Sequence, residues 1–162
     1  MWAGAMSLLT LPVCSLAILN PAVARAAVVE GGGYRLRLQE CQRRPGMMQR
    51  IVCQVVITNL KTAPGHPVIF LKKGHSRAVG PNEQQFAADY VAIGQQKGYS
   101  NLIPRLNSGD STTVALNFSH VPSDVMQFAA LSIHYREDDG GSPYVGEYFA
   151  AVFQSVPILA DW

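Results

Sequence analysis

Two cysteines twelve positions apart, Cys41 and Cys53, are the residues whose types and spacing point most directly to a definite chemistry. A redox pair needs its sulfurs two residues apart at the start of a helix, and the stretch CQRRPGMMQRIVC offers neither feature. A zinc site needs two more ligands, and His66 and His75 do not have paired ligand spacing. An even cysteine count in an exported chain favours a structural disulfide. We therefore predict a Cys41–Cys53 bond.

Catalytic groups are scarce along the rest of the chain. His134 alternates with Ile133 and Tyr135 in LSIHYR, so we expect it to face solvent, and His120 lies in a turn. The sequence has no G-x-S-x-G, H-E-x-x-H or Gly-rich phosphate loop, so we expect neither an enzyme nor a cofactor. The acids of REDDGG (136–141) lack the spacing of a calcium loop and suit a hairpin turn, so we expect no metal there.

Basic residues gather in two segments and suggest a docking surface. If both segments lie at one end of the domain, they form a basic patch with a methionine tip. Such a patch suits an anionic partner, namely lipid headgroups, an acidic polysaccharide or an acidic protein face. A solvated loop with methionines packed over the disulfide is the alternative. The candidate residues are Arg43, Arg44, Met47, Met48, Arg50, Lys72, Lys73 and Arg77.

Four tyrosines offer a second kind of binding surface. Aromatic rings beside Gln and Asn can stack on sugar rings, although packing within the domain explains them equally well. They are Tyr90, Tyr99, Tyr144 and Tyr148. Nucleic acid is not an expected partner, because the net charge of the 162 residues is only +2 and the pI is near 8.5.

Residues 1–26 read as an export signal. An uncharged apolar run precedes small-x-small patterns at 22–24 and 24–26, which are typical of a signal-peptidase site. A retained N-terminal anchor, through which the protein would associate with a membrane, is the alternative. Cleavage near Ala26 removes Cys14 and leaves Cys41 and Cys53 as a pair. We expect an exported protein in a periplasmic, lumenal or extracellular location.

The two cysteines lie on neighbouring segments that alternate as β-strands do. YRLRLQE places Tyr34, Leu36 and Leu38 on one side, and RIVCQVVITN alternates likewise. A loop centred on Met47 sets Cys41 opposite Cys53, whereas a tight turn at Pro45-Gly46 would not. Because Leu38 and Cys41 are an odd number apart, we expect a β-bulge near Gln39-Glu40.

Further strands are expected at 67–71, 86–93, 111–118, 128–136 and 144–156, separated by turn sequences. The inward side of 128–136 is expected to carry Ala129, Leu131, Ile133 and Tyr135. Seven or eight short strands predict an antiparallel β-sandwich, with a closed barrel as the alternative. The expected organisation is a leader (1–26), a flexible lead-in (27–33), the β-domain (34–158) and a tail (159–162).

Several short motifs resemble a family of exported bacterial immunoglobulin-like sandwich modules that is common in cyanobacteria. The motifs are a strand ending in Cys41, C-x-x-x-I-T-N from Cys53 to Asn59, Asp89-Tyr90, L-x-F-x-x-V-P from Leu116, and F-x-x-V-P-I from Phe153. The resemblance covers about 34 to 158 and implies an immunoglobulin-like fold.

The function expected from these features is a non-catalytic interaction or accessory module with a protein partner at the cell envelope, such as a subunit of an envelope or membrane-associated assembly. A module that binds a small ligand, a carbohydrate or a metal is the alternative.

Overall fold

The computed structural model describes residues 27–46, 49–71, 75–102, 104–138 and 147–160, and these residues form an all-β fold. Its one helical element among them is the 3-10 turn η2 (Pro81–Glu83). The strands are β1 (Val28–Gly31), β2 (Tyr34–Arg43), β3 (Ile51–Asn59), β4 (Pro67–Phe70), β5 (Arg77–Val79), β6 (Gln85–Ala87), β7 (Tyr90–Ile93), β8 (Gln96–Gly98), β9 (Asn101–Leu102), β10 (Ser111–Phe118), β11 (Gln127–Glu137) and β12 (Phe149–Ala160).

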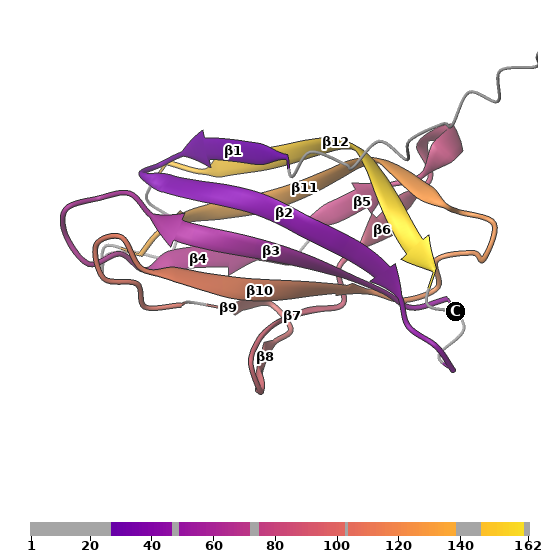
Figure 1. Ribbon diagram of the computed structural model, residues 1–162, viewed down its shortest axis with the longest axis horizontal. Helices are drawn as coiled ribbons and strands as arrows, with labels where there is room; N and C mark the ends of the chain where they lie inside the picture. Colours follow the sequence, from indigo (N-terminus) through magenta and orange to yellow (C-terminus); the bar gives the residue numbers. More distant parts are fainter. Residues whose placement is uncertain (1–26, 47–48, 72–74, 103, 139–146, 161–162) are drawn as a thin grey trace, which may run out of the picture.

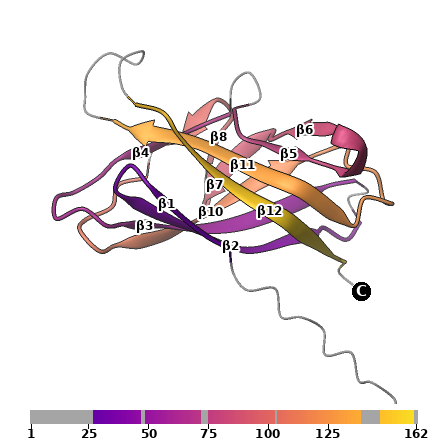
Figure 2. The same ribbon diagram turned by 90° about the horizontal axis from the view of Figure 1, so that it is seen from above.

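The strands belong to one continuous sheet that curls over on itself. Its main order is β6-β5-β11-β12-β2-β3-β10-β7-β8, with β1 beside β2 and with β4 between β11 and β9. Figures 1 and 2 show the β2–β3–β10 half lying across from the β11–β5–β6 half, so that the sheet forms a half-barrel. The prediction of an all-β fold is confirmed. The predictions of seven or eight strands and of purely antiparallel pairing are wrong, because short strands of two to four residues escape pattern reading and β12 pairs with β2 in parallel.

The β2–β3 hairpin and its disulfide are confirmed. Cys41 pairs with Cys53 in the strand register and is bonded to it, with 4.0 Å between their Cα atoms. The register shifts between Leu38 and Glu40, where the bulge was expected. Both cysteines are fully buried, so this bond lies in the core.

The pair β11–β12 changes its inward face partway along. In β11, Phe128 and Leu131 are both buried, and in β12 Phe153 and Val156 are both buried. The change coincides with Ser155, which has a φ of 52°. The prediction that Ala129 faces inward is therefore wrong, since Ala129 is exposed. Beyond this point β12 leaves β11 and pairs Ile158 with Cys41 of β2.

The chain ends differ from the predicted organisation. The expected lead-in 27–33 contains β1, which pairs with β2. Val28 lies opposite Arg37 at one end of this pairing, and Gly31 lies opposite Tyr34 at the other. The expected tail 159–162 overlaps β12, which continues to Ala160. The predicted leader lies outside the described residues. Within the described ranges, no helix is long and apolar enough to cross a membrane.

Large side chains fill the concave side of the sheet. The largest that are fully buried include Tyr34, Tyr135, Phe118, Phe128 and Phe153, contributed by β2, β10, β11 and β12. Burial of this apolar surface is the main stabilising contribution to such a fold.

Candidate functional site

Arg43 has a structural role at the end of β2. Its guanidinium donates hydrogen bonds to the carbonyl oxygens of Val121 (3.1 Å), Pro122 (3.1 Å) and Val125 (2.8 Å). These bonds satisfy the carbonyls of the turn that precedes β11. The Arg43 side chain therefore stabilises the fold at this end of the molecule.

The other basic residues of the predicted patch do not all lie together. Arg77 is in β5 and pairs with Ser132 of β11. Ser132 lies roughly 17 Å along the strand, at the usual rise per residue, from Gln127, the first residue of β11 after the turn that Arg43 binds. The Arg77 Nε atom is buried and has no hydrogen-bond partner among the described residues. Met47, Met48, Lys72 and Lys73 lie outside the described residues. Arg44 and Arg50 remain as the described members of the patch that can contribute to a binding surface.

Arg44 and Arg50 line an open hollow on the convex side of the sheet, across β3, β10 and β7. Its volume is about 450 Å³. We call it the basic groove; its lining residues are Arg44, Pro45, Arg50, Val52, Tyr90, Ala92, Lys97, Ala115 and Asn117. The strand pattern places them there, because Ala92 and Ala115 alternate with the buried Val91, Val114 and Leu116.

The basic groove is positively charged. Three cations, Arg44, Arg50 and Lys97, line it, and no carboxylate among the described residues does. The Lys97 Nζ atom lies 5.2 Å from the centre of the Tyr90 ring, and the Tyr90 and Tyr99 rings are 5.7 Å apart. Cations gathered in a hollow attract anionic groups over several ångströms and hold them at short range. The groove can therefore bind a carboxylate or another anion.

Asn117 adds a hydrogen-bonding group to the groove. It is only 5% exposed, and its side-chain amide makes one long hydrogen bond of 3.4 Å to the carbonyl of Ala115. A side-chain amide carries two N–H donors and an acceptor oxygen. Asn117 thus retains hydrogen-bonding capacity toward a bound group.

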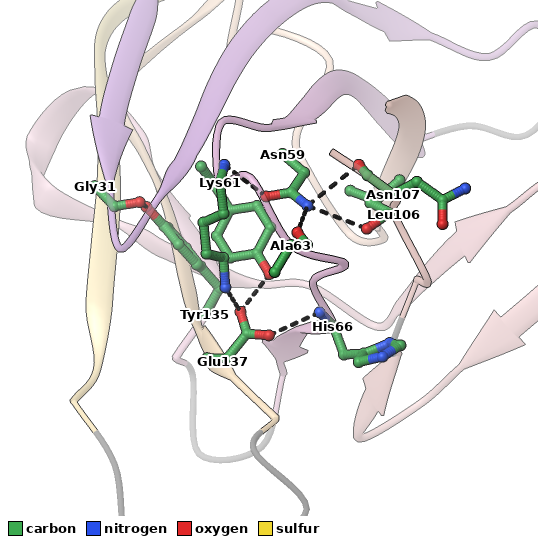
Figure 3. Close-up of polar contacts among 10 residues, drawn as sticks. Gly31, Asn59, Lys61, Ala63, His66, Leu106, Asn107, Tyr135 and Glu137 are labelled. Carbon is green, nitrogen blue, oxygen red and sulfur yellow. Dashed lines mark hydrogen bonds and ion pairs between the residues drawn. The ribbon is translucent and has the colours of Figure 1, made fainter. Parts of the chain in front are cut away.

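A second polar cluster lies at the opposite end of the sheet, around Glu137 (Figure 3). Its carboxylate accepts hydrogen bonds from the Tyr34 hydroxyl, the Lys61 ammonium and, at 2.9 Å, the His66 amide. Burial raises the pKa of Glu137, but these hydrogen bonds outweigh it and the pKa is lowered overall. Burial and the bond to Glu137 raise the pKa of Tyr34. With Tyr34 fully buried, the cluster fastens the segment after β3 to β11.

Asn59, the last residue of β3, fixes the same segment (Figure 3). Its amide nitrogen donates to the carbonyls of Ala63 (2.8 Å), Leu106 (3.1 Å) and Asn107 (3.2 Å). Its side-chain oxygen accepts from the Lys61 amide at 3.0 Å. The motif I-T-N thus ends in a residue needed for folding.

A third cluster joins His75 and His134 to aromatic side chains. The two imidazoles are edge to face at 5.5 Å, and the Tyr148 ring is 5.5 Å from that of Phe70. Burial lowers the pKa of His134, as do the nearby His75 and Arg77. His134 is half-buried rather than freely exposed, because it packs on His75, whereas His120 is exposed as expected. No group of three or more metal-ligating side chains occurs within the described ranges.

The described tyrosines of the predicted sugar platform lie in two separate places. Tyr90 packs against Tyr99 and Lys97 on one side of the molecule, and Tyr148 packs against Phe70 and His75 near β4. Tyr144 lies outside the described residues.

Sequence reasoning missed Lys97 and the small floor residues of the groove. Lys97 lies opposite Ala92 in the β7–β8 hairpin. The available signal was the turn sequence IGQQK, which predicts a hairpin placing Lys97 beside β7. The meeting of this hairpin with the loop between β2 and β3 requires the three-dimensional structure.

Comparisons with known proteins add little. No family model and no curated protein matches the chain. Among solved structures, the chain is similar to the GAE domain of GGA2p from Saccharomyces cerevisiae, with 13% sequence identity and a TM-score of 0.41. The match covers 80% of this chain and 96% of that one.

Proposed function

We propose that this chain is a non-catalytic binding module, immunoglobulin-like in fold, that works outside the cytoplasm and holds an anionic protein partner in the basic groove. The observation that carries the proposal is the gathering of Arg44, Arg50 and Lys97 around one hollow that no carboxylate lines in the described part of the chain. Arginine and tyrosine are the residue types that most often dominate binding energy at protein interfaces. The buried disulfide is typical of a protein that matures in an oxidising compartment.

The proposal is tested with a fluorescent polyglutamate peptide as the anionic probe. The double substitution Arg44→Glu and Lys97→Glu reverses the charge of two exposed groove residues. We expect it to lower the affinity at least tenfold at low salt, because both attractions become repulsions. In the unaltered protein, binding should weaken as salt screens these charges.

The matched control is the double substitution Arg37→Glu and Arg105→Glu, which changes the net charge equally at exposed positions that do not line the groove. Its affinity should stay within about threefold of the unaltered protein, since distant surface charges contribute little. An equal loss in both variants would show that net charge attracts the probe, and the groove would lose its proposed role.

A further inference from the structure

We infer that the basic groove recognises an acidic peptide segment in which carboxylate side chains flank one aliphatic side chain. This inference rests on the proposed function and names the chemistry of its partner. It follows from the way the groove combines a charged rim with a small apolar floor.

The floor consists of small side chains from three adjacent strands. Val52 of β3, Ala115 of β10 and Ala92 of β7 lie on the convex side, between the cations of the rim. Ala92 and Ala115 are half-buried and leave a small apolar surface open at the base, whereas Val52 is only 7% exposed and fills the space beneath them. A ligand made only of charged groups would leave this base unused, whereas one aliphatic side chain would bury it favourably.

Asn117 beside this floor favours a peptide over a simple polyanion. Within the described residues its buried amide makes only the 3.4 Å bond to Ala115, and a peptide backbone supplies both a donor and an acceptor for it. The central strands β3 and β10 already use their backbone groups in the sheet. A bound peptide would therefore be held by side chains on the sheet face.

The aromatic rings of the groove argue against an acidic polysaccharide. Sugar rings bind by stacking on an open aromatic face. The Tyr90 ring is engaged by the Lys97 ammonium at 5.2 Å and by Tyr99 at 5.7 Å. The rest of the base of the groove consists of the aliphatic floor residues, which favour contact with an apolar side chain of the ligand.

The experiment compares synthetic probes of equal charge on the full chain. One peptide has a leucine between two runs of glutamate, and the second has glycine in its place. We expect the leucine peptide to bind about tenfold more tightly, which corresponds to burial of one aliphatic side chain. Ala115→Leu or Ala92→Leu should abolish this preference by filling the floor. Ala87→Leu on the exposed face of β6 is the matched control, and thermal unfolding checks that each variant is folded.

The outcomes separate the inference from the proposed function. Equal affinities for the two peptides, both lost on Arg44→Glu and Lys97→Glu, would overturn the aliphatic requirement and leave an anion-binding groove. Tighter binding of an oligoglucuronate or of phosphatidylserine vesicles would overturn the peptide assignment. If charge reversal altered the affinity of none of these probes, the proposed function itself would fall.

Discussion

Glu137 joins three parts of the chain through one carboxylate, and most of its surroundings come from residues distant in sequence. Tyr34, Lys61 and the His66 amide all donate to it. Because these donors favour the charged form, the folded protein holds the pKa of Glu137 below its ordinary value of 4.5. A carboxyl group of this kind stabilises the fold when it is ionised.

Glu137→Gln should therefore reduce the free energy of unfolding by about 1–2 kcal/mol at neutral pH, where the carboxylate is charged in both states. The folded pKa is the lower one, so this contribution is present above pH 4.5 and is lost as the pH falls through the folded pKa. Urea unfolding across pH 7 to 3 measures it. The difference between the proteins should shrink toward acid, whereas Glu83→Gln, at an exposed site, should show no such trend. A gap independent of pH would contradict the ionic role of Glu137.

Single-residue predictions succeeded where one local rule decided the outcome. The alternation of YRLRLQE placed Tyr34 and Leu36 in the core, and the odd separation of Leu38 from Cys41 located the bulge. The partners of Glu137 and Asn59 could not be predicted, since they depend on loops whose paths the sequence pattern does not specify. The hydrogen bonds of Asn59 give the last residue of I-T-N a structural role.

At the scale of elements, strict alternation of buried and exposed residues failed to predict the change of inward face in β11 and β12. We call this change the corner. Both strands change their inward face at the same level, and the sheet bends there so that β12 can reach β2. Strict alternation along 128–136 assigned Ala129 to the core in place of Phe128. The bulge in β2 was predictable because the disulfide requires Cys41 to face the core, as Leu38 does. No comparable restraint fixes the side of the strand on which the residues around Ser155 lie.

Ser155 tests this corner. Its φ of 52° lies in the left-handed region, which a β-branched residue adopts at a cost of about 1–2 kcal/mol. Ser155→Val should lower the free energy of unfolding by that amount, and Ser155→Gly should leave it unchanged or raise it. Gln154→Val, at the neighbouring exposed position, serves as the control and should have little effect. Urea denaturation compares the variants. Equal tolerance of valine at both positions would show that the corner does not require this backbone conformation.

At the scale of the whole molecule, the all-β class and the first hairpin could be predicted, whereas the curl of the sheet could not. The curl depends on β12, which pairs with β11 over most of its length and with β2 at its end. The basic groove is a product of the same arrangement, because the loop after β2 and the β7–β8 hairpin meet only when β3, β10 and β7 lie side by side. The clustering of basic residues in the sequence indicated Arg44 and Arg50 as site residues. It did not indicate Lys97 or the small floor residues that lie beside them in the groove.

The disulfide connects the stability of the whole domain to the compartment in which it folds. Replacing both Cys41 and Cys53 by alanine removes a cross-link within the core and should cost about 3 kcal/mol in the chain-entropy model. Guanidinium unfolding of the variant, and of the unaltered protein with and without reductant, measures this cost. The reduced protein and the variant should unfold at similar, lower midpoints, since neither has the bond. If reduction left the midpoint unchanged, the bond would not support the fold.

Two free thiols in protein recovered from its natural location would contradict the proposal that it matures outside the cytoplasm, because oxidation of a paired, buried site is expected there.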